Sequence, residues 1–235
     1  MFHIRSYFAA LASRTVPISL ARTTRHVPRL DGQVNRDNTI PPVVEGDFVT
    51  HRGIAGPTGK VVAIKCLRLL SRHYEEGVGR VLCGTFIWSL LEHDNVLPLL
   101  GVTTFDNGLS TVTELIIEGN AHNYVQDPEV EPGPLLLGVA HGLRYLHEHP
   151  AGPIYHGDVT GYNVLVDIDG RALLSGFEHS FIDDPSFSMA PAAPVIGSLR
   201  WMAPEGIEGG RATAERDTWA FAMTALNPFF AYWGL

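Results

Sequence analysis

Cysteine is scarce in this sequence, basic residues are outnumbered, and the apolar stretches are interrupted. The 235 residues contain two cysteines, Cys66 and Cys83, which are too few for a disulfide framework and fit a reducing compartment. Lys and Arg number 17 against 25 Asp and Glu, so nucleic acid is not expected as a main partner, because phosphate binding requires a basic patch. With 45% apolar residues, the chain is expected to fold as a globular protein.

Both ends of the chain differ from the rest in composition. The first thirty residues carry five Arg and no acid, and we expect residues 1–42 to form a basic, disordered leader. The alternative is a mitochondrial transit peptide, so the expected location is the cytoplasm or, in that case, the mitochondrion. The uncharged segment ending at Leu235 approaches the length of a membrane span, but Asn227 and Pro228 interrupt it. We therefore expect an apolar tail at 227–235 and no membrane anchor.

Strand signals dominate the first half of the chain and helix signals the second. Residues 60–70 are rich in β-branched side chains after a turn containing Pro and Gly, which predicts a hairpin. Two more strands, at 95–105 and 109–117, flank an Asp-Asn-Gly turn. Residues 77–91 predict a helix, and 134–149 predict a second one. The expected apolar face of this second helix comprises Leu136, Val139, Leu143 and Leu146.

These elements predict an α+β protein of two lobes with a boundary near Glu118. The β-rich lobe is expected at about 43–117 and the helical lobe at about 118–226.

Four motifs that contain chemically reactive or ligand-binding residues follow one another along the chain. HGDVTGYNVLV places Asp158 and Asn163 five residues apart on a loop before a strand, the arrangement of a catalytic base and a metal ligand. The other three motifs are VAIK, ending at Lys65, LLSGFEHS at 173–180 and GSLRWMAPE at 197–205. Together they resemble a protein kinase domain of the tyrosine-kinase-like group, in a fungal branch that writes the catalytic loop as His-Gly-Asp. The resemblance covers residues 43–226.

This resemblance implies a role for each matching residue. Lys65 matches the lysine that contacts the nucleotide phosphates, Asp158 the catalytic base, and Asn163 a Mg²⁺ ligand. Asp217 matches the acid that ties the catalytic loop to a central helix. The positions that match the ATP-binding residues are Ala63, Lys65, Thr113, Glu114, Ile116 and Leu165. Of these, Ala63 and Leu165 match the residues that enclose the adenine, and Thr113, Glu114 and Ile116 match the hinge that binds its edge. The positions that match an apolar column through the kinase fold are Trp88, His156 and Phe177.

Three departures from the kinase pattern concern the phosphates, and a further one is Gly157, which stands where the usual catalytic loop of the family has an arginine. Gly176 stands where the family has the Mg²⁺-holding aspartate, and Gly84 stands where a helix glutamate pairs with Lys65. The phosphate-covering loop offers only Gly46 and Gly53, with Asp47 and bulky Phe48 where close backbone approach is needed. ATP binding is therefore expected to be weak and Mg²⁺ binding doubtful, although Glu178 is a possible substitute ligand.

Three functions stay open. The first is a pseudokinase that binds other proteins as a signalling scaffold, the second is a weakly active Ser/Thr or Tyr kinase, and the third is a truncated product without function. The third rests on the family's later helices, which are not reached before Leu235, so that the helical lobe is expected to be incomplete. The exposed apolar face expected on the last helix favours self-association; its residues are Trp219, Phe221, Met223 and Leu226.

A zinc site and phosphorylation sites are two further possibilities, and each has a simpler structural explanation. Zinc is not expected at the histidines, which lack Cys or carboxylate partners at ligand spacing; these are His141, His147, His149 and His156. Three serines lie in the segment that kinases often phosphorylate, although an exposed serine-containing loop explains them equally; they are Ser186, Ser188 and Ser198.

Overall fold

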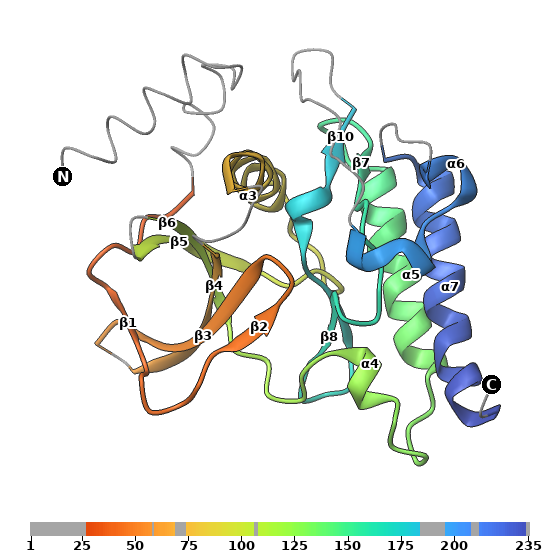
Figure 1. The fold of residues 1–235 in the computed structure, drawn as a ribbon, viewed down its shortest axis with the longest axis horizontal. Coiled ribbons are helices and arrows are strands. Elements are labelled where there is room, and N and C mark those ends of the chain that lie inside the picture. The colour runs from red at the N-terminus through yellow and green to blue at the C-terminus, as the bar shows by residue number, and fades with distance from the viewer. Residues whose placement is uncertain are drawn as a thin grey trace. The chain divides into compact units, whose positions relative to one another are not determined.

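The computed structural model describes residues 27–57, 59–68, 74–105, 108–183, 196–207 and 212–233. The chain divides into two compact units. Residues up to Leu90 and Pro98–Leu115 form the first unit, and Leu91–Leu97 with the residues from Ile116 onward form the second. The first unit is rich in strands and the second in helices (Figure 1), which confirms the predicted α+β class.

An antiparallel six-stranded sheet builds the first unit. Its strand order is β1-β3-β4-β6-β5, and β2 pairs with another part of β3. The two predicted hairpins are present as β3–β4 and β5–β6. The strands are β1 (Val34–Arg36), β2 (Val43–Glu45), β3 (Phe48–Ala55), β4 (Lys60–Leu67), β5 (Leu99–Phe105) and β6 (Gly108–Glu114).

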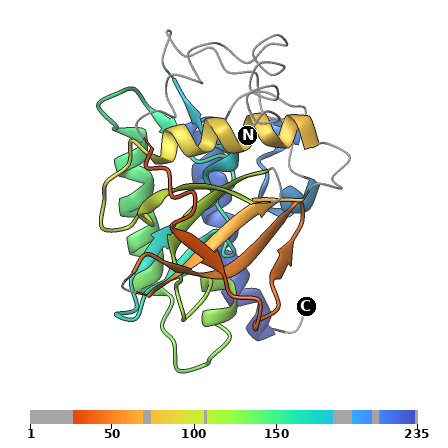
Figure 2. The ribbon, with the colours of Figure 1, turned by 90° about the vertical axis from the view of Figure 1, so that its left-hand side faces the viewer.

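One face of this sheet forms an apolar core. Along β4, buried Val62, Ile64 and Cys66 alternate with half-buried residues, as expected for a strand with one face against a core. Helix α3 (Tyr74–Trp88) packs against β4 and β6 (Figure 2). The predicted helix spanned residues 77–91, so both ends of α3 lie three residues before the predicted ends.

Residues 27–42 belong to the first unit, so the expected disordered leader is wrong for this stretch. Val34 pairs with Ala55 of β3, and Arg29 forms a parallel bridge with Val102 of β5. Val27 and Val34 are each only 3% exposed. The arginine-rich composition of this segment gave no indication that Val27 and Val34 are buried. Residues 1–26 lie outside the described part of the chain.

Two long helices, α5 (Gly133–His147) and α7 (Ala214–Trp233), lie side by side in the second unit (Figure 1). The short strands pair as β7 with β10 and β8 with β9. The remaining elements are α4 (Ala121–Tyr124), α6 (Pro204–Ile207), β7 (Ile154–Tyr155), β8 (Val164–Val166), β9 (Ala172–Leu174), β10 (Phe181–Ile182) and the 3₁₀ helices η2 (Phe177–His179) and η3 (Ile196–Trp201).

The segment Leu91–Leu97 joins the second unit through β9. The side-chain amide of Asn95 donates to the carbonyl of Ala172 at 2.9 Å, and the carbonyl of Asn95 accepts from the N–H of Leu174 at 2.9 Å. The strand predicted from residue 95 is therefore wrong before Leu99, because residues 95–97 pair with β9 instead of β6.

The buried face of α5 differs in part from the predicted one, whereas α7 exposes two residues of the apolar face that was expected to be exposed. On α5, Leu135 is buried and Leu136 only half-buried, whereas Val139, Leu143 and Leu146 are buried as predicted. On α7 the buried residues include the polar Asp217 and Thr224, while Trp219 and Leu226 are each 44% exposed.

Helix α7 continues through Asn227 and Pro228 to Trp233, so the expected separate tail is wrong for residues 227–233. Among the helices of the described ranges, none combines the length and apolarity needed to cross a membrane.

Candidate active site

Lys65 lies on the face of β4 that turns away from the apolar core. Ala63 shares this face, because alternate residues of a strand point to the same side. The ammonium of Lys65 lies over the ring of Phe48, with 4.6 Å between Nζ and the ring centroid. An aromatic face attracts a cation through its quadrupole, so Phe48 is an interaction partner of Lys65 that sequence reasoning missed.

The connection between β2 and β3 is a turn of two residues, Gly46 and Asp47. Its length follows from the pairing of Glu45 with Phe48. Gly53, which was expected in the phosphate-covering loop, instead lies within β3 and pairs with Val62. The segment expected to cover the phosphates is therefore a tight hairpin with a single glycine, Gly46, in its turn.

An ion pair links this turn to helix α3. Arg80 Nη2 lies 3.5 Å from Asp47 Oδ2, and the Arg80 side chain is 17% exposed. Gly84, one turn further along α3, is buried and offers no carboxylate. In this ion pair the cation, Arg80, lies on the helix and the acid, Asp47, lies in the turn of the sheet. The glutamate–lysine pair that the resemblance implies has the opposite arrangement, with the acid on the helix and the cation on the sheet.

The predicted hinge begins on β6, next to β4. Thr113 pairs with Ala63 and Glu114 with Val62. The Thr113 hydroxyl donates to the Glu114 carbonyl at 3.2 Å, and the Glu114 side chain pairs with Lys60 at 3.2 Å. Three of the five expected adenine-contacting residues, Ala63, Thr113 and Glu114, therefore lie on adjacent strands. The other two, Ile116 and Leu165, are half-buried residues of the second unit.

In the second unit, Asp158 and Asn163 contact each other. The side-chain amide Nδ2 of Asn163 donates to the Asp158 carboxylate at 2.7 Å and to the Asp158 carbonyl at 2.9 Å. These bonds orient the Asp158 carboxylate and use both protons of the amide, which leaves Oδ1 as the remaining polar atom of Asn163. The predicted base and the predicted metal ligand are thus brought together.

Gly176 leaves space that the Asn163 side chain fills. Its φ is +79°, a conformation that side-chain-bearing residues rarely adopt. A Cβ added there would collide with Asn163 Oδ1 and would lie 2.6 Å from Asn163 Cγ. The side chain of an aspartate therefore does not fit at this position without a shift of Asn163.

These residues do not fit the kinase Mg²⁺ site. Of the two positions that ligate Mg²⁺ in the resembled family, Asn163 offers its amide oxygen, whereas Gly176 has no side chain with which to complete the pair. Within the described ranges, no group of three or more His, Cys, Asp or Glu side chains could hold a metal ion. Glu178, the substitute considered above, is buried in η2 with 8% of its surface exposed.

Asp217 of α7 holds the catalytic loop. Its two carboxylate oxygens accept the backbone N–H groups of His156 and Gly157, each at 2.8 Å. His147 of α5 adds a third contact from its Nε2 at 3.0 Å, which sequence reasoning missed. Asp217 is only 1% exposed, and its charge is compensated by these donors. Burial and then the surrounding acids, Asp217 among them, raise the pKa of Tyr155.

His156 and Phe177 are fully buried and pack on each other, with 5.0 Å between their ring centroids. His156 Nε2 lies 2.9 Å from the Ser175 carbonyl, which can only accept, so the ring carries a proton on Nε2. Trp88, the third member of the predicted column, is 4% exposed on α3 of the first unit.

Gly157 is required by its position in the catalytic loop. Its φ is +79°, and a Cβ added there would collide with the carbonyl oxygen of His179. An arginine, which is usual in the family, would not fit this backbone.

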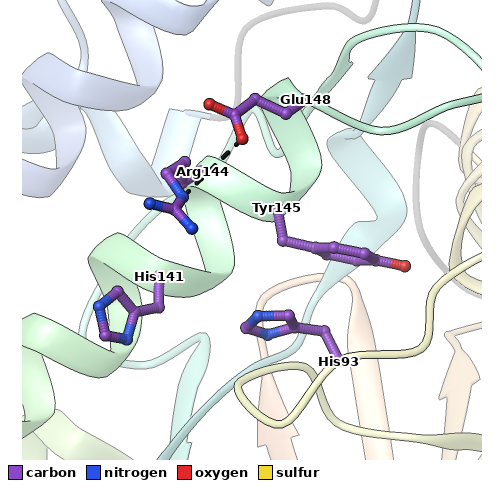
Figure 3. A pocket seen from close by; sticks show the side chains of 5 residues that line it. All are labelled: His93, His141, Arg144, Tyr145 and Glu148. Atoms are coloured by element: carbon purple, nitrogen blue, oxygen red, sulfur yellow. Dashed lines mark ion pairs between the residues drawn. The ribbon is translucent and has the colours of Figure 1, made fainter.

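The four histidines considered as zinc ligands contact different partners. His141 lines an open pocket beside α5 together with His93, Arg144, Tyr145 and Glu148 (Figure 3). His149 packs edge-on against Tyr145, whereas His147 and His156 have the contacts described above. None of the predicted catalytic or nucleotide-binding residues lines this pocket. Of the serines, Ser186 and Ser188 lie outside the described residues, and the backbone of Ser198 lies in η3.

A curled antiparallel sheet with Lys65 on a central strand, and a helical unit whose Asp158 loop is tied to a long helix, define the protein kinase class. The sequence matches the family described as protein tyrosine and serine/threonine kinase over residues 43–229, and the chain belongs to this family.

Several named relatives support this assignment. The chain is 30% identical over 192 residues to the probable serine/threonine-protein kinase PBL24 of Arabidopsis thaliana, covering 78% of this chain and 49% of the relative. It is 28% identical over 181 residues to the cytokinesis protein sepH of Aspergillus niger, covering 75% of this chain and 13% of the relative. The chain thus spans about half or less of the length of these curated relatives. The assignment to the tyrosine-kinase-like group stays a prediction.

Proposed function

We propose that this chain is a pseudokinase, a kinase-like module that binds other proteins and transfers phosphate at no more than a background rate. The observation that carries this proposal is Gly176, which supplies no carboxylate and whose side-chain space is filled by Asn163. Gly84 and the two-residue turn at Gly46 add two further losses that act on the same phosphates.

The magnitude of these losses decides between impaired and efficient catalysis. Removing one preorganised charge-stabilising group costs about 10²- to 10³-fold in turnover. Two roughly independent losses reduce a kinase rate of about 1 to 100 s⁻¹ by about 10⁴-fold or more, although such effects are often not additive.

A direct assay of the purified chain tests the proposal. Incubation with labelled ATP, Mg²⁺ or Mn²⁺ and generic protein substrates is expected to give phosphate incorporation that Asp158→Asn does not lower. Robust Mg²⁺-dependent incorporation that Asp158→Asn abolishes would overturn it. Dependence on Asp158 is the informative comparison, because trace contaminating kinases would not respond to that substitution.

A weakly active kinase is the second candidate, and the ordered contact between Asn163 and Asp158 favours it. Because the relative PBL24 is named as a probable serine/threonine-protein kinase, Ser or Thr is the expected acceptor. Nucleotide binding separates the two candidates: the second requires a thermal shift with ATP in the presence of Mg²⁺ or Mn²⁺. The absence of any shift would remove it, whereas the pseudokinase proposal requires only protein binding.

A further inference from the structure

We infer that Phe48, the first residue of β3 after the β2–β3 turn, caps the ammonium of Lys65, so that the site prefers an uncharged adenine ligand, such as adenosine, over ATP. This inference rests on the proposed function, since it takes Lys65 as the phosphate-contacting residue and the hinge as the adenine-contacting segment. It names the class of ligand that the pseudokinase binds, and it assigns Phe48 as the residue that sets this selectivity.

The strand register brings Phe48 to Lys65. Lys65 pairs with Thr50 across the β3–β4 ladder, and Phe48 lies two residues from Thr50 on the same strand. Residues two apart on a strand share a face, so Phe48 is the diagonal neighbour of Lys65. The measured 4.6 Å between the ammonium and the ring centroid is within the range of a cation–π contact.

Three contacts hold the turn of Gly46 and Asp47, which precedes Phe48, in place. Arg68 donates its backbone N–H to the Asp47 carbonyl at 2.8 Å and its Nη1 to the Gly46 carbonyl at 3.2 Å. Arg80 of α3 pairs with the Asp47 carboxylate at 3.5 Å. The turn is therefore fixed both to β4's end and to the helix, and Phe48 follows directly after it.

This arrangement disfavours phosphates because a phosphate group and the Phe48 ring would compete for the same ammonium. Adenosine carries no phosphate and needs no contact with Lys65. A cation–π contact of ordinary strength lowers phosphate affinity by about 2- to 30-fold.

The affinities of adenosine and ATP, measured by calorimetry without divalent metal, test the inference. In the wild-type chain adenosine is expected to bind at least as tightly as ATP. Phe48→Ala is expected to tighten ATP binding relative to adenosine by about 2- to 30-fold. Val44→Ala is the matched control, because Val44 lies on the same hairpin, is 57% exposed and pairs with Val49. Its ATP-to-adenosine ratio is expected to equal that of the wild type.

The ratio of the two affinities separates selectivity from folding damage, which would weaken both ligands together. If Phe48→Ala loses adenosine binding, Phe48→Leu, which keeps the apolar bulk without the ring, supplies the ratio. An unchanged ratio, or a wild-type chain that binds neither ligand, overturns the inference and leaves the pseudokinase proposal standing. Robust phosphotransfer in the assay above would overturn that proposal, whatever the ratio.

Discussion

The side-chain amide of Asn163 donates to the carboxylate of Asp158 at 2.7 Å, and its Oδ1 lies where the Cβ of a residue at position 176 would be. The three positions that a kinase uses for its base and its metal are thus coupled in this chain. Because Gly176 has no side chain, Asn163 can fill the space beside it. The lost carboxylate is therefore not an isolated substitution that one reverse mutation would repair.

Gly176→Asp is expected to leave phosphotransfer at background and to destabilise the fold by about 2–4 kcal/mol. A left-handed backbone costs a non-glycine residue about 1–2 kcal/mol, and displacing Asn163 removes hydrogen bonds worth about 1 kcal/mol each. Urea unfolding of Gly176→Asp, Asn163→Ala and the double variant measures the coupling. Since Asn163→Ala removes the obstruction, the two costs should sum to more than the cost of the double variant. Strict additivity would show that Asn163 does not obstruct this position.

Removing the Asp217 carboxylate should loosen the catalytic loop more than removing His147. Asp217→Ala leaves the N–H groups of His156 and Gly157 without their acceptor, which costs about 1–3 kcal/mol for the buried N–H of His156 and less for the part-buried one of Gly157. His147→Ala should cost about 1 kcal/mol, because its side chain remains 21% exposed. Amide hydrogen exchange at His156 and Gly157 reports the loss directly. Unchanged protection of these two amides in Asp217→Ala would contradict the assigned role.

Much of the catalytic loop could be predicted because its residues are close in sequence. Asp158 and Asn163 are five residues apart on one loop, so a motif places them together whatever the rest of the chain does. The same holds for the β3–β4 hairpin, whose turn residues are local. The class of the fold followed from the order of such local signals.

The contacts that sequence reasoning missed join segments far apart in the chain. Arg80 meets Asp47 across 33 residues, and His147 meets Asp217 across 70. No local pattern marks either pair, since an arginine on a helix and a histidine near a helix end are both ordinary surface residues. The order of residues 27–42 was missed for the same reason, because it depends on pairing with β3 and β5.

Cys83 is expected to resist alkylation in the folded chain. Burial raises the pKa of its thiol from 9.0 to about 11, so the reactive thiolate is scarcer at any pH below that value. At pH 8 this lowers the thiolate fraction by about a hundredfold, and labelling by iodoacetamide should slow at least as much. Mass spectrometry of the native and the urea-unfolded chain gives the two rates. Similar rates in both states would show that the thiol is accessible and ionises normally.

Gly157→Ala is expected to destabilise the chain more than Gly170→Ala, although the two glycines have nearly the same backbone. Their φ values are +79° and +77°, so both substitutions carry the cost of a left-handed residue, about 1–2 kcal/mol. They differ in their surroundings, because an added Cβ meets the His179 carbonyl at position 157 and nothing within 4 Å at position 170.

The difference in unfolding free energy between these variants therefore isolates the collision, which should add at least about 1 kcal/mol at Gly157. Urea unfolding of both proteins under the same conditions measures it. Equal losses would mean that the loop moves aside without cost and that glycine is not required there. A larger loss at Gly157 would explain why this catalytic loop carries no arginine, since the backbone that binds Asp217 leaves no space for a side chain at that position.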